Sequence, residues 1–197
     1  MIQQHPSQSS DSRTSGAVPA RMAGVTLLEL LIVIAIVGIL MAVGVPSFKY
    51  ITTSYRISGE INGLLGDVQF ARAEAVKEGQ NVTVCVSSDG LTCAGTTWQS
   101  GWIVFPDPTS SLTTNGNAAL VLRRQAAFTG SDTFTNGATG AVIFNREGLA
   151  SGLLNSGGAV IPLHEATGNL AWTRCLQLSN VGAAIVVQNT TAGVSCT

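Results

Sequence analysis

The sequence predicts an α+β protein in which one long N-terminal helix packs on an antiparallel β-sheet or sandwich domain. Residues 25–45 form an apolar run with a single charge, Glu29, and a run of that length can span a bilayer as a helix. After Gly79 the hydrophobic period changes to two residues, and Gly, Ser, Thr and Asn become frequent. That composition is typical of short strands joined by turns.

The composition fits one modest domain and an anchor. The chain has 197 residues, of which 11% are charged, and a net charge of −1. Residues 1–24 hold Arg13, Arg21 and Asp11, so the chain from Val25 onward has eight basic and ten acidic residues. A nearly neutral domain lacks the basic patch that nucleic-acid binding requires.

The N-terminal segment differs from an ordinary secretory signal. Residues 1–21 are polar, and Arg13 and Arg21 favour the cytoplasmic side of a membrane. A secretory signal has a short apolar stretch followed by the cleavage site, whereas here the apolar stretch is longer and a small residue, Gly24, stands before it. Met22 is an alternative start.

A single helix is predicted from Val25 to about Glu78, roughly 80 Å long at 1.5 Å per residue. Residues 25–47 are apolar on all sides and form the membrane-spanning half, in which Pro46 should produce a kink. Residues 48–79 are amphipathic, and we expect their charged side to be solvated. The apolar residues of this half recur at three- and four-residue steps: Ile61, Leu64, Leu65, Val68, Ala71 and Ala75.

Residues 80–197 are predicted to form the β domain. Trp98, Trp102 and Phe105 are expected in its core. Residues 82–86 should form a strand with one buried face, Pro162 marks an edge strand, and the last two strands form a hairpin. The predicted strands span residues 82–86, 98–105, 118–124, 141–144, 160–163, 173–178 and 183–187.

Four cysteines indicate two disulfides, because the body of the chain is expected outside the cytoplasm. Three connectivities are open, and we favour the local one, Cys85 with Cys93 and Cys175 with Cys196. Closing the second loop, of about 20 residues, stabilises by roughly 3 kcal/mol in the chain-entropy model. The spacings do not resemble those of a zinc site, so no metal is expected.

No catalytic constellation is visible in the sequence. His164 stands beside Glu165 with no nucleophile marked for it to activate, and residues 137–140 lack the Lys of a phosphate-binding loop. We therefore expect that the chain is not an enzyme and needs no cofactor.

The N-terminal motif resembles the prepilin signature of type IV pilins and type II secretion pseudopilins. It consists of Gly24-Val25-Thr26-Leu27-Leu28-Glu29 followed by an apolar helix and Pro46. The resemblance implies that residues 1–24 are a leader, that a prepilin peptidase cuts between Gly24 and Val25, and that Val25 is then N-methylated. Val25 departs from the family, where Phe is usual. The implied location is the bacterial inner membrane, single-pass with a periplasmic C-terminal domain, and a filament after assembly.

Glu29 lies in the apolar run, where an isolated charge costs about 2.5–3.5 kcal/mol at the helix centre and less near an end. One interpretation pairs its carboxylate with the Val25 amine, of its own chain or a neighbour's, when subunits pack helix against helix. The other leaves it at the membrane interface with no partner. Its coincidence with the Gly24 cleavage site favours the first interpretation, in which Glu29 and Pro46 belong to the assembly surface.

Patches further along the chain resemble the GspH/FimT family of minor pseudopilins. They are Phe70–Ala75, Cys85–Cys93, Trp98–Trp102 and Cys175–Ser179. The resemblance implies a pilin-like fold and a minor subunit of a type IV pilus or a type II secretion pseudopilus, with other pilin subunits as partners. A DNA receptor for natural transformation is one alternative. A membrane-anchored binding module outside any filament is another, and it requires that Gly24 is never cut.

The DNA-binding members of that family carry a Gly-Arg-x-Arg-x-Arg segment in the C-terminal hairpin. Here the matching residues, Gly182–Val187, keep the glycine and lack all three arginines. Phosphate binding needs clustered cations, so DNA binding is disfavoured. The one basic doublet, Arg123-Arg124, should have one member solvated and the other paired at a sheet edge, because neighbours on a strand face opposite sides.

Overall fold

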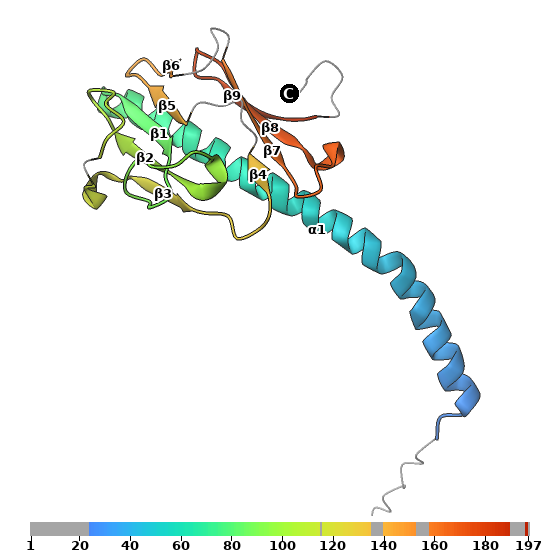
Figure 1. Ribbon diagram of the computed structural model, residues 1–197. Coiled ribbons are helices and arrows are strands. Elements are labelled where there is room, and N and C mark those ends of the chain that lie inside the picture. Colours follow the sequence, from blue (N-terminus) through green and yellow to red (C-terminus); the bar gives the residue numbers. More distant parts are fainter. Residues whose placement is uncertain (1–23, 115, 135–139, 153–157, 190–195, 197) are drawn as a thin grey trace, which may run out of the picture. The chain divides into compact units, whose positions relative to one another are not determined.

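The computed structural model describes residues 24–114, 116–134, 140–152, 158–189 and 196 (Figure 1). The chain divides into two compact units, Met1–Gly44 and Val45–Thr197. The predicted leader up to residue 23 and residues 137–139 of the glycine-containing loop lie outside the described residues.

One helix, α1 (Leu27–Glu78), contributes to both units and contains 52 residues, including Pro46. It begins two residues after the predicted start. It ends where predicted, because Gly79 has φ +66°, a left-handed conformation that glycine adopts without steric cost and that commonly terminates helices. By length and composition alone, α1 is apolar enough to cross a membrane.

Within the second unit, one face of α1 forms the base of the hydrophobic core. The predicted apolar face is confirmed with two adjustments: Ile57 extends it by one turn, and Leu65 is only half-buried. The buried residues follow helical spacing: Ile57, Ile61, Leu64, Val68, Ala71 and Ala75.

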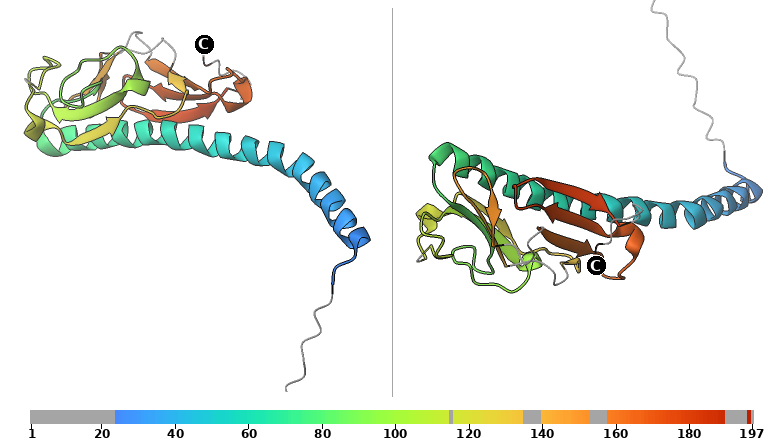
Figure 2. Two further views of the ribbon diagram at one scale, coloured as in Figure 1. Left: turned by 60° about the horizontal axis from the view of Figure 1, so that its bottom comes forward. Right: turned by 90° about the horizontal axis from the view of Figure 1, so that it is seen from above.

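Two antiparallel sheets lie along this part of α1 (Figure 2). The first has the order β3-β2-β1-β5-β6 and the second the order β4-β7-β8-β9. The first sheet is built from β1 (Val82–Val86), β2 (Gly101–Pro106), β3 (Arg123–Ala126), β5 (Ala141–Phe144) and β6 (Ala150–Ser151). The second is built from β4 (Thr133–Phe134), β7 (Ala159–His164), β8 (Arg174–Leu178) and β9 (Ala184–Gln188).

Both sheets contribute to one core against α1. Trp102 and Phe144 of the first sheet and Ile161 and Leu176 of the second are at most 1% exposed and belong to the same cluster as Leu64. The expectation that Trp98, Trp102 and Phe105 are core residues is confirmed, since all three are buried. The α+β prediction of a long helix packed on antiparallel sheet is therefore confirmed.

The prediction that the first strand has a single buried face is wrong. All five residues of β1 are buried, because a second small cluster covers the outer face of the sheet. Cys85, Ile103 and Phe105 form that cluster, with Cys93 and Val121 packed against it. On the same side, the hydroxyl of Thr83 donates a hydrogen bond to buried Asp107 (3.0 Å).

Two predicted strands begin later than expected because short 3₁₀ turns precede them. Trp98–Ser100 form such a turn, and β2 starts only at Gly101, whose φ of +104° interrupts extended chain. Ala118–Leu120 form another, capped by the side chain of Asn117, and β3 follows from Arg123. In each turn, residues that the period-two pattern assigned to a strand form local hydrogen bonds instead of bonds to a neighbouring strand.

Pro162 does not mark an edge strand. It lies in β7, which is paired with β8 on one side and β4 on the other. Among the described residues, the ladder between β4 and β7 covers Leu163 and His164, and Pro162 pairs with Cys175 of β8. The predicted C-terminal hairpin is confirmed as β8 and β9, which pair from Leu178 and Ala184 at the turn to Arg174 and Gln188.

Both disulfides join cysteines that are near in sequence. Cys85 of β1 is bonded to Cys93, eight residues later, and Cys175 of β8 to Cys196, 21 residues later. The first bond fastens the loop after β1 to the outer face of the first sheet, and the second ties Cys196 back to the second sheet.

The dependence of the core on α1 gives a direct stability prediction. Leu64→Ala should lower the free energy of unfolding by about 2–5 kcal/mol, because a fully buried leucine is replaced by a cavity. Urea denaturation of the full chain in detergent measures the change. Gln69→Ala, on the exposed side of the same helix, should stay within about 0.5 kcal/mol. Equal effects of the two substitutions would contradict the packing described above.

Candidate functional site

The start of α1 is fixed by a local cap. The backbone N–H of Glu29 donates to the hydroxyl oxygen of Thr26 (3.2 Å), and the N–H of Leu30 donates to the Thr26 carbonyl (3.2 Å). Thr26 is thus the N-cap residue, with Glu29 at the third helical position, the spacing of a capping box. Sequence reasoning missed the role of Thr26, although the Thr-x-x-Glu pattern is the signal for it.

The predicted cleavage bond lies just outside this cap. Gly24 and Val25 are exposed and precede the helix, and a side chain built at Gly24 would meet no atom within 4 Å. Glu29 is exposed in the first turn, where a carboxylate is favoured by the helix dipole. The geometry therefore leaves the bond accessible and places one acidic group at the beginning of the helix.

The first unit presents an apolar surface. Every described residue from 24 to 44 is exposed. Such a surface is stable in a lipid bilayer or against other apolar helices, not in water. The exposed large side chains include Val25, Leu27, Leu28, Leu30, Leu31, Ile32, Val33, Ile34, Ile36, Val37, Ile39, Leu40, Met41 and Val43.

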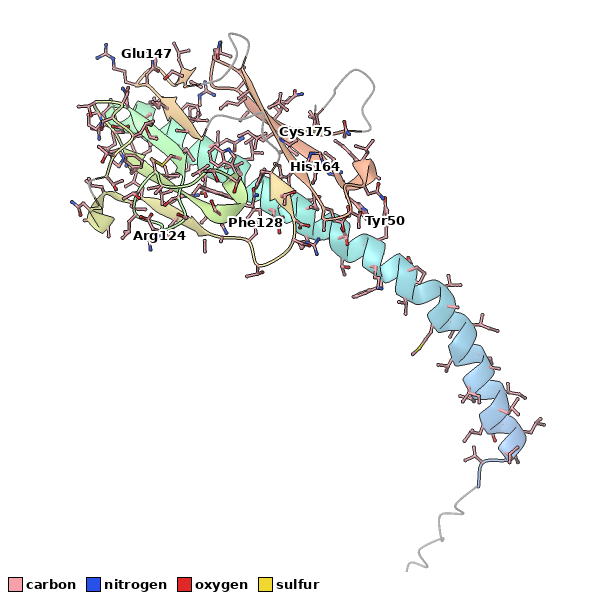
Figure 3. All side chains as sticks on the ribbon, viewed as in Figure 1. Tyr50, Arg124, Phe128, Glu147, His164 and Cys175 are labelled. Carbon is pink, nitrogen blue, oxygen red and sulfur yellow. A yellow bond between two sulfur atoms is a disulfide. The ribbon has the colours of Figure 1, made fainter. Side chains whose placement is uncertain are left out.

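The polar side of the second half of α1 is not simply a solvated face, contrary to expectation. Asp67 accepts a hydrogen bond from the indole N–H of Trp102 (2.8 Å) and one from Arg123 (3.0 Å). The Arg123 guanidinium also lies 3.9 Å from the centre of the Phe70 ring, a cation–π contact. Arg124 remains exposed on the edge strand β3 (Figure 3), so the doublet divides as predicted.

Arg72 joins two turns that are distant in sequence. Its Nε donates to the carbonyl of Gly148 (3.0 Å) and its Nη2 to the carbonyl of Val181 (3.2 Å). Gly182 has φ +76°, and a Cβ there would collide with the Gly148 carbonyl oxygen. The glycine at this place is therefore required by the close packing of the two turns.

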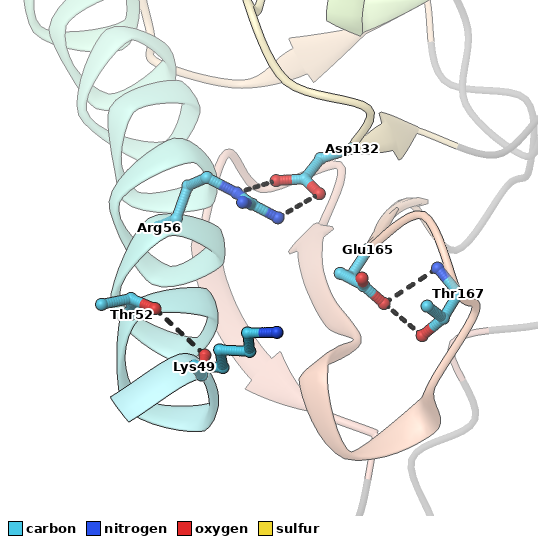
Figure 4. A network of polar contacts seen from close by, with 6 residues as sticks. All are labelled: Lys49, Thr52, Arg56, Asp132, Glu165 and Thr167. Atoms are coloured by element: carbon cyan, nitrogen blue, oxygen red, sulfur yellow. Dashed lines mark hydrogen bonds and ion pairs between the residues drawn. The ribbon is translucent and has the colours of Figure 1, made fainter. Parts of the chain in front are cut away.

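Arg56 forms a bidentate ion pair with Asp132, the residue before β4 (Figure 4). The two bonds are 2.6 and 2.8 Å long, and the Asp132 side chain is completely buried whereas that of Arg56 is half-exposed. A buried carboxylate needs such a partner, since desolvation of an unpaired charge is costly. This pair fastens the start of the second sheet to α1.

Glu60 lies beside this pair and forms no ion pair of its own within the part of the chain that the structure describes. Burial raises the pKa of its carboxyl to about 7, with further contributions from the charge of Asp132 and a hydrogen bond to it, while Arg56 acts in the opposite direction. One carboxyl oxygen is shielded from water and accepts no hydrogen bond among the described residues. A protonated Glu60 can instead donate to Asp132, which explains the direction of the shift.

The remaining candidate residues do not assemble into an active site. His164 lies at the end of β7 (Figure 3), with its Nδ1 3.1 Å from the Thr173 hydroxyl, and burial lowers its pKa. Arg146 pairs with Glu147, and Arg174 donates to the carbonyls of Ala171 and Thr173. Within the described ranges, no group of three or more His, Cys, Asp or Glu side chains could hold a metal ion.

Comparison with known proteins gives two family matches. The model described as type II transport protein GspH matches residues 60–182, more than half of the chain. The model described as the prokaryotic N-terminal methylation motif matches residues 19–45. The second range contains the capped start of α1, and the first contains most of the second unit.

Among characterised relatives, the type IV narrow pilus major component PilA5 of Thermus thermophilus is 33% identical over 84 residues. These residues are 41% of this chain and 72% of the relative. Two crystal forms of the type IV minor pilin FimU of Pseudomonas aeruginosa (strain PAO1) are similar in structure. The first has a TM-score of 0.54 and 20% sequence identity, and the match covers 73% of this chain and 96% of the FimU chain. The second has a TM-score of 0.50 and 21% identity, and the match covers 71% of this chain and 99% of the FimU chain. At that identity the similarity shows the fold, which is pilin-like.

The Glu60 carboxyl predicts a pH-dependent stability. Its pKa is about 7 in the folded chain and about 4.5 when unfolded, so between these values the folded state binds the extra proton. The contribution of Glu60 to the free energy of unfolding is thus fully present below pH 4.5, and it is lost as the pH rises to about 7. Thermal unfolding of wild type and Glu60→Gln at about pH 5 and about pH 8 measures it.

The difference in stability between wild type and Glu60→Gln isolates the contribution of Glu60. His164, whose pKa is lowered, makes stability rise with pH, but it does so equally in both proteins. Glu60→Gln should gain stability relative to wild type more at the higher pH than at the lower. A constant difference at the two pH values would show that Glu60 titrates normally.

Proposed function

We propose that this chain, which belongs to the family of the type II transport protein GspH and has its role in a type IV pilus or a type II secretion pseudopilus, is a minor subunit that assembles into such a filament or initiates it. The observation that carries the proposal is that the N-terminal methylation motif coincides with the capped apolar start of α1, whose residues up to 44 are all exposed. Members of this family are structural subunits, and we propose no enzymatic activity for this chain.

We propose that a prepilin peptidase removes residues 1–24 and that Val25 is then N-methylated. The exposed, non-helical position of the Gly24–Val25 bond supports this, because a peptidase needs extended chain. Cleavage would leave the new amine directly before the Thr26 cap. Helix formation would then not depend on the leader, since Thr26 and Glu29 supply the cap themselves.

We further propose that Glu29 pairs with the Val25 amine, of its own chain or a neighbouring subunit's, when apolar helices assemble. Within the described chain Glu29 forms no ion pair. In a bundle of helices an unpaired carboxylate would be costly, and the pair relieves that cost. Residues 25–47, including Pro46, are the proposed assembly and membrane segment, with inner-membrane insertion before assembly and residues 80–197 in the periplasm.

Glu29→Ala should leave membrane insertion intact, because an apolar residue replaces a charge in the spanning segment, but should abolish incorporation into filaments. Membrane fractionation and immunoblotting of sheared filaments measure the two steps. Mass spectrometry of the wild-type N-terminus should show methylated Val25.

An intact Gly24–Val25 bond in the wild-type protein would favour the membrane-anchored binding module instead. Normal incorporation of Glu29→Ala would refute the pairing. The gene neighbourhood separates the two filament types, since other minor pilin genes indicate a pilus, and secretin and secretion ATPase genes indicate secretion.

The alternative of a DNA receptor finds little support in the hairpin. Ala184 and Val186 of β9 pack against the core, and Ile185 is exposed between them, so the outer face of β9 carries no charge there. The full chain in detergent should not retard duplex DNA in a gel shift at micromolar concentration. Retardation that weakens with added salt, the mark of phosphate contacts, would support the receptor function.

A further inference from the structure

A groove of about 460 Å³ runs beside the second half of α1. One wall is the helix from Tyr55 to Gly63, and the other includes Trp102 and the chain from Ala127 to Thr129. Side chains built at Gly59 and Gly63 would meet no atom within 4 Å. An entering group can therefore reach the helix backbone without displacing any part of the protein.

The charges around the groove are unequal. The Arg56 guanidinium is committed to buried Asp132 by two hydrogen bonds, and Asp67, the next carboxylate along α1, is matched by Arg123. Glu60 lines the groove and forms no ion pair with any described residue. When Glu60 is ionised, it and the buried Asp132 face the single guanidinium of Arg56, so this cluster beside the groove carries a net charge of −1.

The remaining surface of the groove suits a cation with an apolar stem. Phe128 is half-buried and lines the groove, and it contacts the almost completely buried Trp102 edge to face, with ring centres 5.9 Å apart. Aromatic faces attract ammonium and guanidinium groups, and the methylene chains of Lys and Arg pack readily on apolar walls. An anionic or neutral ligand would leave the Glu60 charge unmatched.

An uncharged exposed stripe continues from the groove along α1. Its residues are small or neutral and lie at helical spacing: Gly59, Asn62, Gly63, Gly66, Gln69 and Ala73. Small side chains on a helix allow the axis of a second helix to come close. A neighbouring subunit packed along this stripe would bring its side chains to the mouth of the groove.

We propose that this groove receives a Lys or Arg side chain of a neighbouring pilin subunit, whose cation pairs with Glu60 beside Trp102 and Phe128. The proposal rests on the proposed function, since the partner is another subunit of the filament. It assigns to Glu60 the role of a binding residue. The structure explains why the carboxyl is tolerated there unpaired: burial favours its protonated, neutral form until the partner arrives.

Proton competition follows from this arrangement. The groups that face Glu60 are Asp132 and Arg56, and Glu165 acts on Arg56 from the second sheet. Because the pKa of Glu60 is about 7, the cation should bind about tenfold more weakly at about pH 6 than at about pH 8.

The first test uses the full chain in detergent micelles, labelled for the NMR signals of its tryptophan indoles. N-acetyl-arginine amide and N-acetyl-lysine amide serve as probes at the same two pH values. At least one should shift an indole signal saturably at millimolar concentration, with about tenfold lower affinity at the lower pH and at least tenfold lower affinity in Glu60→Gln. Glu78→Gln is the matched control, because it removes the same charge from an exposed position of the same helix.

The proposal fails if neither probe binds, if N-acetyl-glutamate amide binds equally well, or if Glu60→Gln binds like the wild type. The second test compares incorporation of Glu60→Gln and Glu78→Gln into filaments, with several-fold loss expected only for the first. Loss in Glu29→Ala together with wild-type incorporation of Glu60→Gln would reject the groove and keep the proposed function. Wild-type incorporation of Glu29→Ala would reject the proposed pairing in the filament independently of the groove.

Discussion

Burial of one face of α1 is the interaction on which the rest of the second unit depends. The face from Ile57 to Ala75 is apolar at every helical turn and is almost completely removed from water. Side chains from both sheets complete the same core, so neither sheet has an inner face that is independent of the helix. Burial of this kind is strong but non-directional, and by itself it does not decide where along the helix each sheet rests.

The polar residues of α1 supply that direction. Arg56 reaches Asp132 before β4, Asp67 reaches Trp102 and Arg123 of the first sheet, and Arg72 reaches the turns at Gly148 and Val181. Each contact is made by a side chain next to the buried face. Hydrogen bonds have strict geometry, so together these contacts fix the register of the sheets along the helix, while the apolar face supplies most of the free energy.

The parts of the fold that sequence predicts well are those that repeat. Hydrophobic periods of 3.6 or two residues mark the inner face of α1, strands β1 and β5, and the β8–β9 hairpin. The N-terminal motif is also predictable, because its residues are neighbours in the sequence. Strands β4 and β6 have two residues each, too few to show a period, and the turns at Trp98 and Ala118 depend on a few local hydrogen bonds. The ion pair of Arg56 joins residues 76 positions apart. No local pattern specifies such a contact, and the groove at Glu60 depends on it.

The close approach of Gly182 to Gly148 has a consequence for how this hairpin can diversify. The turn demands glycine because of backbone packing, and Ala184 and Val186 are held by the core. The alternate positions Ala183, Ile185 and Val187 point the other way along an extended strand, and they are the positions at which DNA-binding relatives carry arginine. Scaffold and recognition surface are therefore interleaved on one strand, residue by residue. Selection can exchange the outward series for basic, apolar or neutral side chains while the turn and the core stay as they are.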